Sequence, residues 1–471
     1  MSLHPVSLSH GSRMEAAFLA ADITIGALSG FVCDVAASLK LGTSLAGAVR
    51  SAAQRHPAAV EAFDLAGRDD HAIETQFALS DRLTFPNETL PQIMSFERHG
   101  ARTSLGLDSL AALDVHSLLA MCGAGRFTVA QIRDAADASV SPLFESLLEN
   151  GILVAGASSA PLPARMVRPG VTRLQHAGLL YRGNESGVLV DPHFHSSYEP
   201  HGLRENLMRS QFEGLVDAIL ISHSHRDHFD LPTLMTFSPE TLIVVPRADR
   251  ATMMCPDFAA TLRALGFTRV VTLDWYDPPL TIGDLQVHAF PFYGEQPLLR
   301  EAPRHVDLRN HGNTYVVQHD SYTSWFLIDS GNDWTGRMVD VAHAVKERFG
   351  TVDILLSNLR EFALLKPTYI TGAGHYWLAL TPDQMRRFSS MRNDVITLGP
   401  KGVAEICHIV QAREFLPYAH WWGEAGEPPG PEERLLIEEL RSGLNTFGAA
   451  TKIYPWHIGE SYHPGRYNRH G

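Results

Sequence analysis

Four side chains that can bind a metal ion stand within six positions of this sequence: His223, His225, Asp227 and His228. Imidazole nitrogens and carboxylate oxygens are ligands for zinc, iron and similar ions. The alternating His223 and His225 can face one ion, while Asp227 and His228 turn toward a second. A single histidine is most often an ordinary core or surface residue, but four ligand-type residues in one short loop favour a metal pair.

The segment from His223 to His228 has the pattern H-x-H-x-D-H, and in it the chain resembles the metallo-β-lactamase superfamily. The resemblance covers about residues 170–425. Residues 188–192 resemble the early strand of the family that ends in an aspartate, here Asp191, and residues 326–331 resemble the strand that carries its bridging aspartate. The resemblance implies that Asp329 bridges two metal ions. We expect Asp191 to orient a ligand histidine through a hydrogen bond.

The last ligand of the family is a histidine that follows a late strand. Residues 415–423 resemble that strand and its histidine, which implies His420 as the ligand. The alternative is His375, which stands in the glycine-rich segment 371–377 and can equally bring an imidazole to the site.

Glu295 marks a departure from most dinuclear hydrolases of the superfamily, which have a histidine between the motif and the bridging aspartate. In this respect, and in its two-part layout, the chain resembles the diiron β-hydroxylase of chloramphenicol biosynthesis. The implied set of metal ligands then contains three carboxylates, and such oxygen-rich sites suit iron better than zinc. Its members are His223, His225, Asp227, His228, Glu295, Asp329 and His420.

The resemblance implies an oxygenase that uses two iron ions, dioxygen and an external reductant, with Asp227 and Glu295 at the reacting centre. Its substrate would be derived from an amino acid, as a small molecule or bound to a carrier protein or peptide, and would undergo hydroxylation or amine oxidation. Aromatic residues can line the pocket, although core packing explains each equally well: Tyr293, Tyr369, Trp377, Trp421 and Trp422.

The alternative function is a hydrolase of the lactonase or phosphodiesterase type with two zinc ions. It requires that Glu295 be an exposed turn residue and that His288 or His305 supply the missing ligand. Glu295 is therefore the residue that separates the two hypotheses.

The elements that must position these residues begin near residue 166. Apolar runs typical of strands alternate with helical patterns, which predicts an α/β fold, the metallo-β-lactamase αββα sandwich, over residues 166–471. The predicted strands cover residues 187–191, 216–222, 241–245, 285–290, 314–318, 325–329 and 352–356.

Residues 1–160 show mostly helical, alanine-rich patterns without a run of strands, so we predict a helical accessory domain there. Residues 127–154 have the order helix, turn, helix, strand, as in a winged helix, with capping signals at Thr128, Ser141 and Asn150. A plain helical packing or dimerisation unit is the alternative, and a homodimer is possible. Residues 157–165 are the expected linker.

The composition of the chain bears on its partners and on its location in the cell. The 471-residue chain has a net charge of -13, which disfavours nucleic acid as a partner. Its four cysteines are scattered, as in a reduced cytoplasmic protein. The most apolar early stretch, residues 14–39, contains Glu15, Asp22 and Asp34, so we expect neither a signal peptide nor a membrane span.

Overall fold

The computed structural model describes most residues between 93 and 464. The gaps are 107–108, 157–161, 195–206, 226, 249–254, 297–299, 303–305, 307, 363–382, 385–386, 388–393, 421 and 424–428. Before residue 93 it describes residues 5–8, 13–17 and parts of 31–73.

Two seven-stranded sheets dominate the described part of the chain. The first has the order β11-β10-β9-β8-β7-β6-β21 and the second the order β12-β13-β14-β15-β18-β19-β20. The strands of the first sheet are β6 (Gly170–Arg173), β7 (Leu179–Arg182), β8 (Gly187–Val190), β9 (Ala218–Leu220), β10 (Leu242–Pro246), β11 (Val270–Leu273) and β21 (Ser461–Tyr462). Those of the second are β12 (Leu280–Ile282), β13 (Leu285–Pro291), β14 (Asn313–His319), β15 (Tyr322–Ile328), β18 (Ile354–Ser357), β19 (Glu414–Pro417) and β20 (Lys452–Ile453).

The sheets pack face to face because their strands are apolar on both sides. In β8, Val188 and Val190 belong to the core that also contains Val287 and Phe326 of the second sheet, whereas Leu189 belongs to a different core. Alternate residues of a strand point to opposite faces of the sheet, so a continuous apolar run indicates a strand that is covered on both faces. All seven predicted strands are present, with ends shifted by a few residues.

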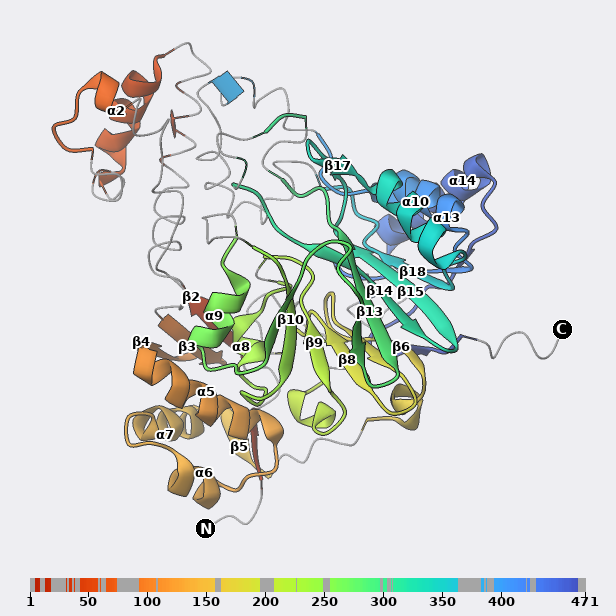
Figure 1. The fold of residues 1–471 in the computed structure, drawn as a ribbon. Helices are drawn as coiled ribbons and strands as arrows, with labels where there is room; N and C mark the ends of the chain where they lie inside the picture. The colour runs from red at the N-terminus through yellow and green to blue at the C-terminus, as the bar shows by residue number, and fades with distance from the viewer. Residues whose placement is uncertain are drawn as a thin grey trace.

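Helices cover the outer face of each sheet, which completes the predicted αββα sandwich. Beside the second sheet lie α10 (Met338–Phe349), α13 (Gly399–Val410) and α14 (Pro431–Phe447), which share a core with Trp325 and Leu355. Beside the first lie the short α8 (Leu231–Leu234) and α9 (Phe258–Ala264) (Figure 1). Smaller elements are η2 (Ala164–Val167), η3 (Arg209–Phe212), β16 (Asn332–Asp333) and β17 (Gly336–Arg337).

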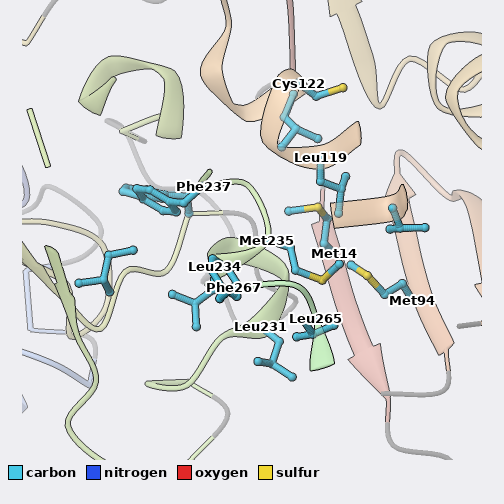
Figure 2. Packing of buried hydrophobic residues seen from close by; sticks show 14 of the residues in the cluster. Met14, Met94, Leu119, Cys122, Leu231, Leu234, Met235, Phe237, Leu265 and Phe267 are labelled. Carbon is cyan, nitrogen blue, oxygen red and sulfur yellow. The ribbon is translucent and has the colours of Figure 1, made fainter. Parts of the chain in front are cut away.

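The N-terminal part packs against α8 and α9 through one continuous apolar core. Figure 2 shows Met14, Met94 and Leu119 of the N-terminal part in the same apolar cluster as Leu234 and Phe267. The N-terminal elements are β1 (Val6–Leu8), β2 (Arg13–Ala17), α2 (Leu45–Arg55), β3 (Ile93–Arg98), β4 (Ala101–Gly106), α5 (Ser109–Ala124), α6 (Val129–Ala135), α7 (Ser141–Glu149) and β5 (Leu153–Ala155). The domain boundary near residue 160 stays a prediction.

The absence of a run of strands from residues 1–160 was a wrong prediction. Strands β2, β3 and β4 form a three-stranded antiparallel sheet, and β1 pairs with β5. Residues His99 and Gly100 turn the chain between β3 and β4 with φ of 49° and 84°. Positive φ at two successive turn residues is the geometry that matches the twist of a tight hairpin.

The unit at residues 127–154 has the predicted order of helix, turn, helix and strand. Thr128 and Gln131 form the predicted capping box of α6, and Gly151 follows the end of α7 with φ of 65°. Ser141 is the first residue of α7 and Val140 its cap, one position from the prediction. No helix among the described residues is long and apolar enough to cross a membrane.

Candidate metal centre

The predicted site residues follow strands that end at the same edge of the sandwich. Strand β8 precedes Asp191 and runs parallel to β9, which leads into the loop of His223. In the second sheet, β15 precedes Asp329 and runs parallel to β18 and β19, the last of which precedes His420. The carboxyl ends of parallel strands meet at one edge, which explains how residues from distant parts of the chain converge.

The first group of possible ligands is His223, His225 and Glu295. Glu295 Oε2 lies 2.9 Å from His225 Nδ1 and 3.3 Å from His223 Nε2. Neighbouring ligand atoms on one ion are about 3 Å apart when each bond is about 2.1 Å long. These three atoms therefore have the spacing of ligands that share an ion.

The second group contains Asp227, His228 and His420, with Asp329 between the two histidines. Asp329 Oδ2 lies 3.0 Å from His228 Nε2 and 2.7 Å from His420 Nε2. Asp227 Oδ2 is 3.8 Å from His228 Nε2. Asp329 also forms a group with His223 and His228, one from each side of the site, so it occupies the place expected of a bridging carboxylate.

The inward-facing atoms of these residues fit two cations. Within the described part of the chain, several of them are fully buried and make no hydrogen bond: His223 Nε2, His228 Nε2, Glu295 Oε2 and both carboxylate oxygens of Asp329. Buried polar atoms without partners are costly, and a shared ion removes that cost. Four imidazoles and three carboxylates facing one another make up a donor set that suits metal ions.

Asp191 sets the proton positions on two of the histidines. It accepts hydrogen bonds from the Ser222 backbone N–H (2.8 Å), from Ser222 Oγ (2.5 Å) and from His228 Nδ1 (2.9 Å). Because Ser222 Oγ donates to Asp191, it accepts from His223 Nδ1 at 2.9 Å. Both rings therefore direct the Nε2 atom into the site, and the predicted hydrogen bond from a candidate ligand histidine to Asp191 is present.

A buried amide, that of Asn310, contacts the ring of His225. Its side-chain amide lies 3.1 Å from His225 Nε2, on the far side of the ring from Glu295. Asn310 is fully buried, and its backbone pairs with the side chain of Gln296, which directly follows Glu295. In the structure the nitrogen Nδ2 of this amide faces His225 Nε2, and the oxygen Oδ1 accepts a hydrogen bond from Ser224 Oγ. With a metal on His225 Nδ1 and a proton on Nε2, the amide would need the opposite orientation, with its oxygen toward the ring.

The backbone of the site is held in unfavourable conformations. Positive φ occurs at Asp191 (41°), Glu295 (49°), Ile328 (57°), Ala419 (64°) and His420 (46°). Such conformations cost roughly 1–3 kcal/mol each for residues other than glycine, and they gather at functional sites. Of the nine described residues other than glycine that have positive φ, these five lie at or directly beside candidate site residues.

A glycine allows the two sheets to approach each other beside His223. Gly312 forms an isolated bridge with His223, and a Cβ atom at Gly312 would lie 2.7 Å from the His223 Cβ. The backbone N–H of Asn313 donates to the Ser222 carbonyl at 2.7 Å, which extends this contact. The position of His223 therefore depends on the missing side chain at residue 312.

Burial and the charges of neighbouring side chains together set the protonation of the site residues. Burial, with a smaller contribution from His228, lowers the pKa of His223 to about 4, so its ring is neutral as a metal ligand must be. Burial raises the pKa of Asp329, but His420 and His228 outweigh it and hold that pKa well below its ordinary value. Burial lowers the pKa of His228, but Asp227, Asp191 and Asp329 raise it well above its ordinary value. The same negative field would hold a cation.

Residues 187–421 match the family model of the β-lactamase superfamily domain. The chain carries a β-lactamase superfamily domain. The matched range lies within the region of about 170–425 predicted from the motif. It contains all seven predicted ligands.

The chain is also similar in sequence to a curated enzyme. A stretch of 179 residues is 31% identical to the 4-amino-L-phenylalanyl-[CmlP-peptidyl-carrier-protein] 3-hydroxylase of Streptomyces venezuelae. That stretch is 37% of this chain and 32% of the relative, so the match spans about a third of the curated protein.

The fold is similar to the crystal structure of CmlA, a diiron β-hydroxylase from Streptomyces venezuelae, with a TM-score of 0.62. The match covers 98% of this chain and 99% of that chain at 16% identity. A mutant of CmlA gives a TM-score of 0.59 at 18% identity, over 95% of this chain and 98% of that chain. At these identities the likeness shows a shared fold.

Within the superfamily domain, the structure brings together all seven residues predicted as ligands, and their role as ligands stays a prediction. His375 lies outside the described residues, as do His305, Tyr369, Trp377 and Trp421. His288 lies elsewhere, with its ring 4.8 Å from that of Phe349 on α10, so it cannot replace Glu295. Glu295 is buried and is not the exposed turn residue that the hydrolase alternative requires.

Two of the aromatic residues can be placed. Trp422 belongs to the core beneath α10 and α13, which agrees with the packing interpretation. The ring of Tyr293 packs edge-on against Trp275, with centroids 5.3 Å apart.

Sequence reasoning missed His176, which joins the group of Asp227, His228 and His420. It also missed Asn310. Neither residue stands near the motif in the sequence, and only the pairing of distant strands brings them to the site.

Proposed function

We propose that the protein is a dinuclear non-haem iron oxygenase that hydroxylates an amino-acid-derived substrate held on a carrier protein. The observation that carries this proposal is the Glu295 carboxylate, whose Oε2 lies 2.9 Å from His225 and 3.3 Å from His223. It gives the site a third carboxylate beside Asp227 and Asp329. Oxygen-rich, anionic donor sets suit iron in its higher oxidation states.

The relatives support the same class of reaction. The curated relative is named a hydroxylase of an aminoacyl group on a peptidyl carrier protein, and CmlA is described as a diiron β-hydroxylase. The likeness to CmlA covers nearly the whole of both chains, including the N-terminal part. We extend both the diiron centre and the carrier-bound substrate to this protein as proposals.

In the proposed reaction one oxygen atom of dioxygen enters a C–H bond of the substrate and the other leaves as water. Two electrons and two protons must come from an external reductant, and the bound iron pair supplies the redox chemistry. The seven predicted ligands of this chain would hold the two ions. Asp329 lies between the two groups of ligands and would contribute to both, while Glu295 would add a carboxylate to the first group and Asp227 one to the second.

The outer residues keep this arrangement in place during turnover. Asp191 and Ser222 hold the rings of His223 and His228 with the Nε2 atoms inward. His223, Glu295 and Asp329 are buried, which would keep bulk water away from bound metal ions and so limit side reactions.

Replacing Glu295 by histidine tests the proposal. Glu295→His would restore the donor set of a hydrolase, so the reduced protein should lose its reaction with dioxygen by at least about 100-fold. The measurement is the rate at which the iron-loaded, chemically reduced protein reoxidises in oxygenated buffer. Glu240→His, at an exposed carboxylate, is the control and should leave the rate unchanged. A Glu295→His variant that reoxidises like the parent protein would refute the role of Glu295.

A further inference from the structure

His176 enters the site from an element that none of the seven predicted ligands shares. It lies in the tight turn between β6 and β7, which is closed by hydrogen bonds from Leu174 N–H to the Gly178 carbonyl (2.9 Å) and from Gly178 N–H to the Gln175 carbonyl (2.8 Å). Its φ is 51°, in the left-handed region that glycine or asparagine usually fills. Such backbone conformations gather at functional sites, and here the turn places the imidazole beside Asp227.

The ring of His176 is buried among the groups of the second metal position. Its Nε2 atom lies 3.0 Å from Asp227 Oδ2. The ring centroid is 5.2 Å from that of His420, 5.6 Å from that of His228 and 5.1 Å from that of His193. His193 is fully buried, so the ring of His176 has three histidine rings as neighbours.

Asp227 is the group of the second position that most needs a fixed partner. Its side chain is 20% exposed, whereas those of His228, Asp329 and His420 are 0%, 1% and 4% exposed. A carboxylate at the solvent side of a metal site can rotate, change its mode of binding or take up water. The hydrogen bond from His176 restrains that rotation.

We propose that His176 is the positioning residue for the second metal ion. Its Nε2–H donates to Asp227 Oδ2 and holds the carboxylate close to the ligand atoms of His228 and His420. A nitrogen that donates this hydrogen bond has no lone pair for a metal, so His176 acts through Asp227 and is not an eighth ligand. The proposal rests on the dinuclear site of the proposed function.

Anaerobic titration with Fe(II), followed by competition with a chelator, measures the affinity for each ion separately. In the full-length protein, His176→Ala should weaken binding of the second ion by about 10–100-fold and leave the first unchanged, because partners of metal ligands typically have effects of this size. His176→Gln retains an N–H donor at a similar reach and should restore most of the affinity. The absorption bands of Co(II) in the second site should shift in His176→Ala and return in His176→Gln.

His288→Ala is the control for folding, because His288 is also a buried histidine but packs against Phe349 outside the site. It should bind both ions like the parent protein. The proposal is overturned if His176→Ala binds the second ion with parental affinity. It is also overturned if a folded His176→Gln is as weak as His176→Ala, since the imidazole itself would then be the ligand. A parent protein that binds no ion pair would refute the proposed function together with this inference.

Discussion

Asp191 shows how a single carboxylate organises the centre without facing the ions. Three donors from Ser222 and His228 converge on it, and through Ser222 it also sets the ring of His223. A metal site depends on such outer contacts almost as much as on the ligands. Substitutions of such single residues can therefore separate an effect on metal affinity from an effect on the stability of the fold.

We predict that Asp191→Asn weakens binding of both metal ions by about 10–100-fold. The amide cannot accept all three hydrogen bonds, and it places a donor against Ser222 or His228. Titration with Fe(II) would measure the affinity, and urea denaturation would measure the free energy of unfolding of the metal-free protein.

Asp284→Asn provides the matched control. Asp284 also accepts several hydrogen bonds, from Ser186 Oγ and from the backbone N–H groups of Asn184 and Ser186, but it lies outside the site. It should lower the free energy of unfolding and leave metal affinity intact. Equal loss of affinity in both variants would show that Asp191 acts only through stability.

At this scale the sequence predicted the residues that a local motif or a strand end reveals. His223, His225, Asp227 and His228 stand together, and Glu295, Asp329 and His420 each follow an apolar strand. His176 and Asn310 have no such signal. A histidine in a hairpin turn and an asparagine in a loop are common, and only three-dimensional proximity gives these two a role.

At the scale of elements, the loop of Glu295 depends on Gly294 and Gly331, whose backbones pack together. The backbone N–H of Gly331 donates to the Tyr293 carbonyl at 2.6 Å, and that of Glu295 donates to the Ile396 carbonyl at 3.0 Å. Gly294 has a φ of 90°, and a Cβ atom there would lie 2.5 Å from Gly331 N. The ends of β13 and β15 thus meet backbone to backbone.

Gly294→Ala should displace Glu295 and lower the affinity for the first metal ion by at least about tenfold, because the ligand geometry of the loop is lost. Gly350→Ala is the control for strain alone, since Gly350 has a φ of 72° with nothing within 4 Å of its Cβ position. Both variants should lose about 1 kcal/mol or more of stability. Parental affinity for both ions in Gly294→Ala would contradict the role of this contact.

The strands of the sandwich were predictable because they are apolar on both faces, which leaves short continuous runs such as residues 352–356. The strands of the N-terminal part were not. Strand β4 alternates half-buried and exposed residues, and β3 carries Glu97 and Arg98 at its end. The alanine-rich helical patterns around them outweighed this weak signal. The turn residues His99 and Gly100 join β3 to β4 in the structure, and this hairpin was not predicted from the sequence.

At the scale of the whole molecule, His116 connects the N-terminal part to the sandwich. From α5 its Nδ1 lies 2.7 Å from the Leu265 carbonyl and its Nε2 lies 3.0 Å from the Phe237 carbonyl. The apolar core around His116 is a single cluster that contains residues of both parts, among them Val6 and Phe267. No local sequence pattern could predict this shared core, because it joins residues more than a hundred positions apart.

Burial lowers the pKa of His116 below its ordinary value of 6.5, although the two carbonyls oppose this shift. The unfolded chain then binds more protons than the folded one, so the contribution of His116 to stability is present above about pH 6.5 and is lost as the pH falls. Urea unfolding from pH 5 to 8 should show a steeper loss of stability at acid pH for the parent protein than for His116→Gln. Identical pH profiles would contradict this prediction.

The metal content of the purified protein tests the proposed centre most directly. The full-length protein would be loaded anaerobically with Fe(II), freed of unbound metal, oxidised in air and examined by metal analysis and absorption spectroscopy. We predict about two iron ions per chain and an absorption band of an oxygen-bridged ferric pair. Tight binding of zinc in preference to iron, with esterase or phosphodiesterase activity, would contradict the oxygenase and support the hydrolase.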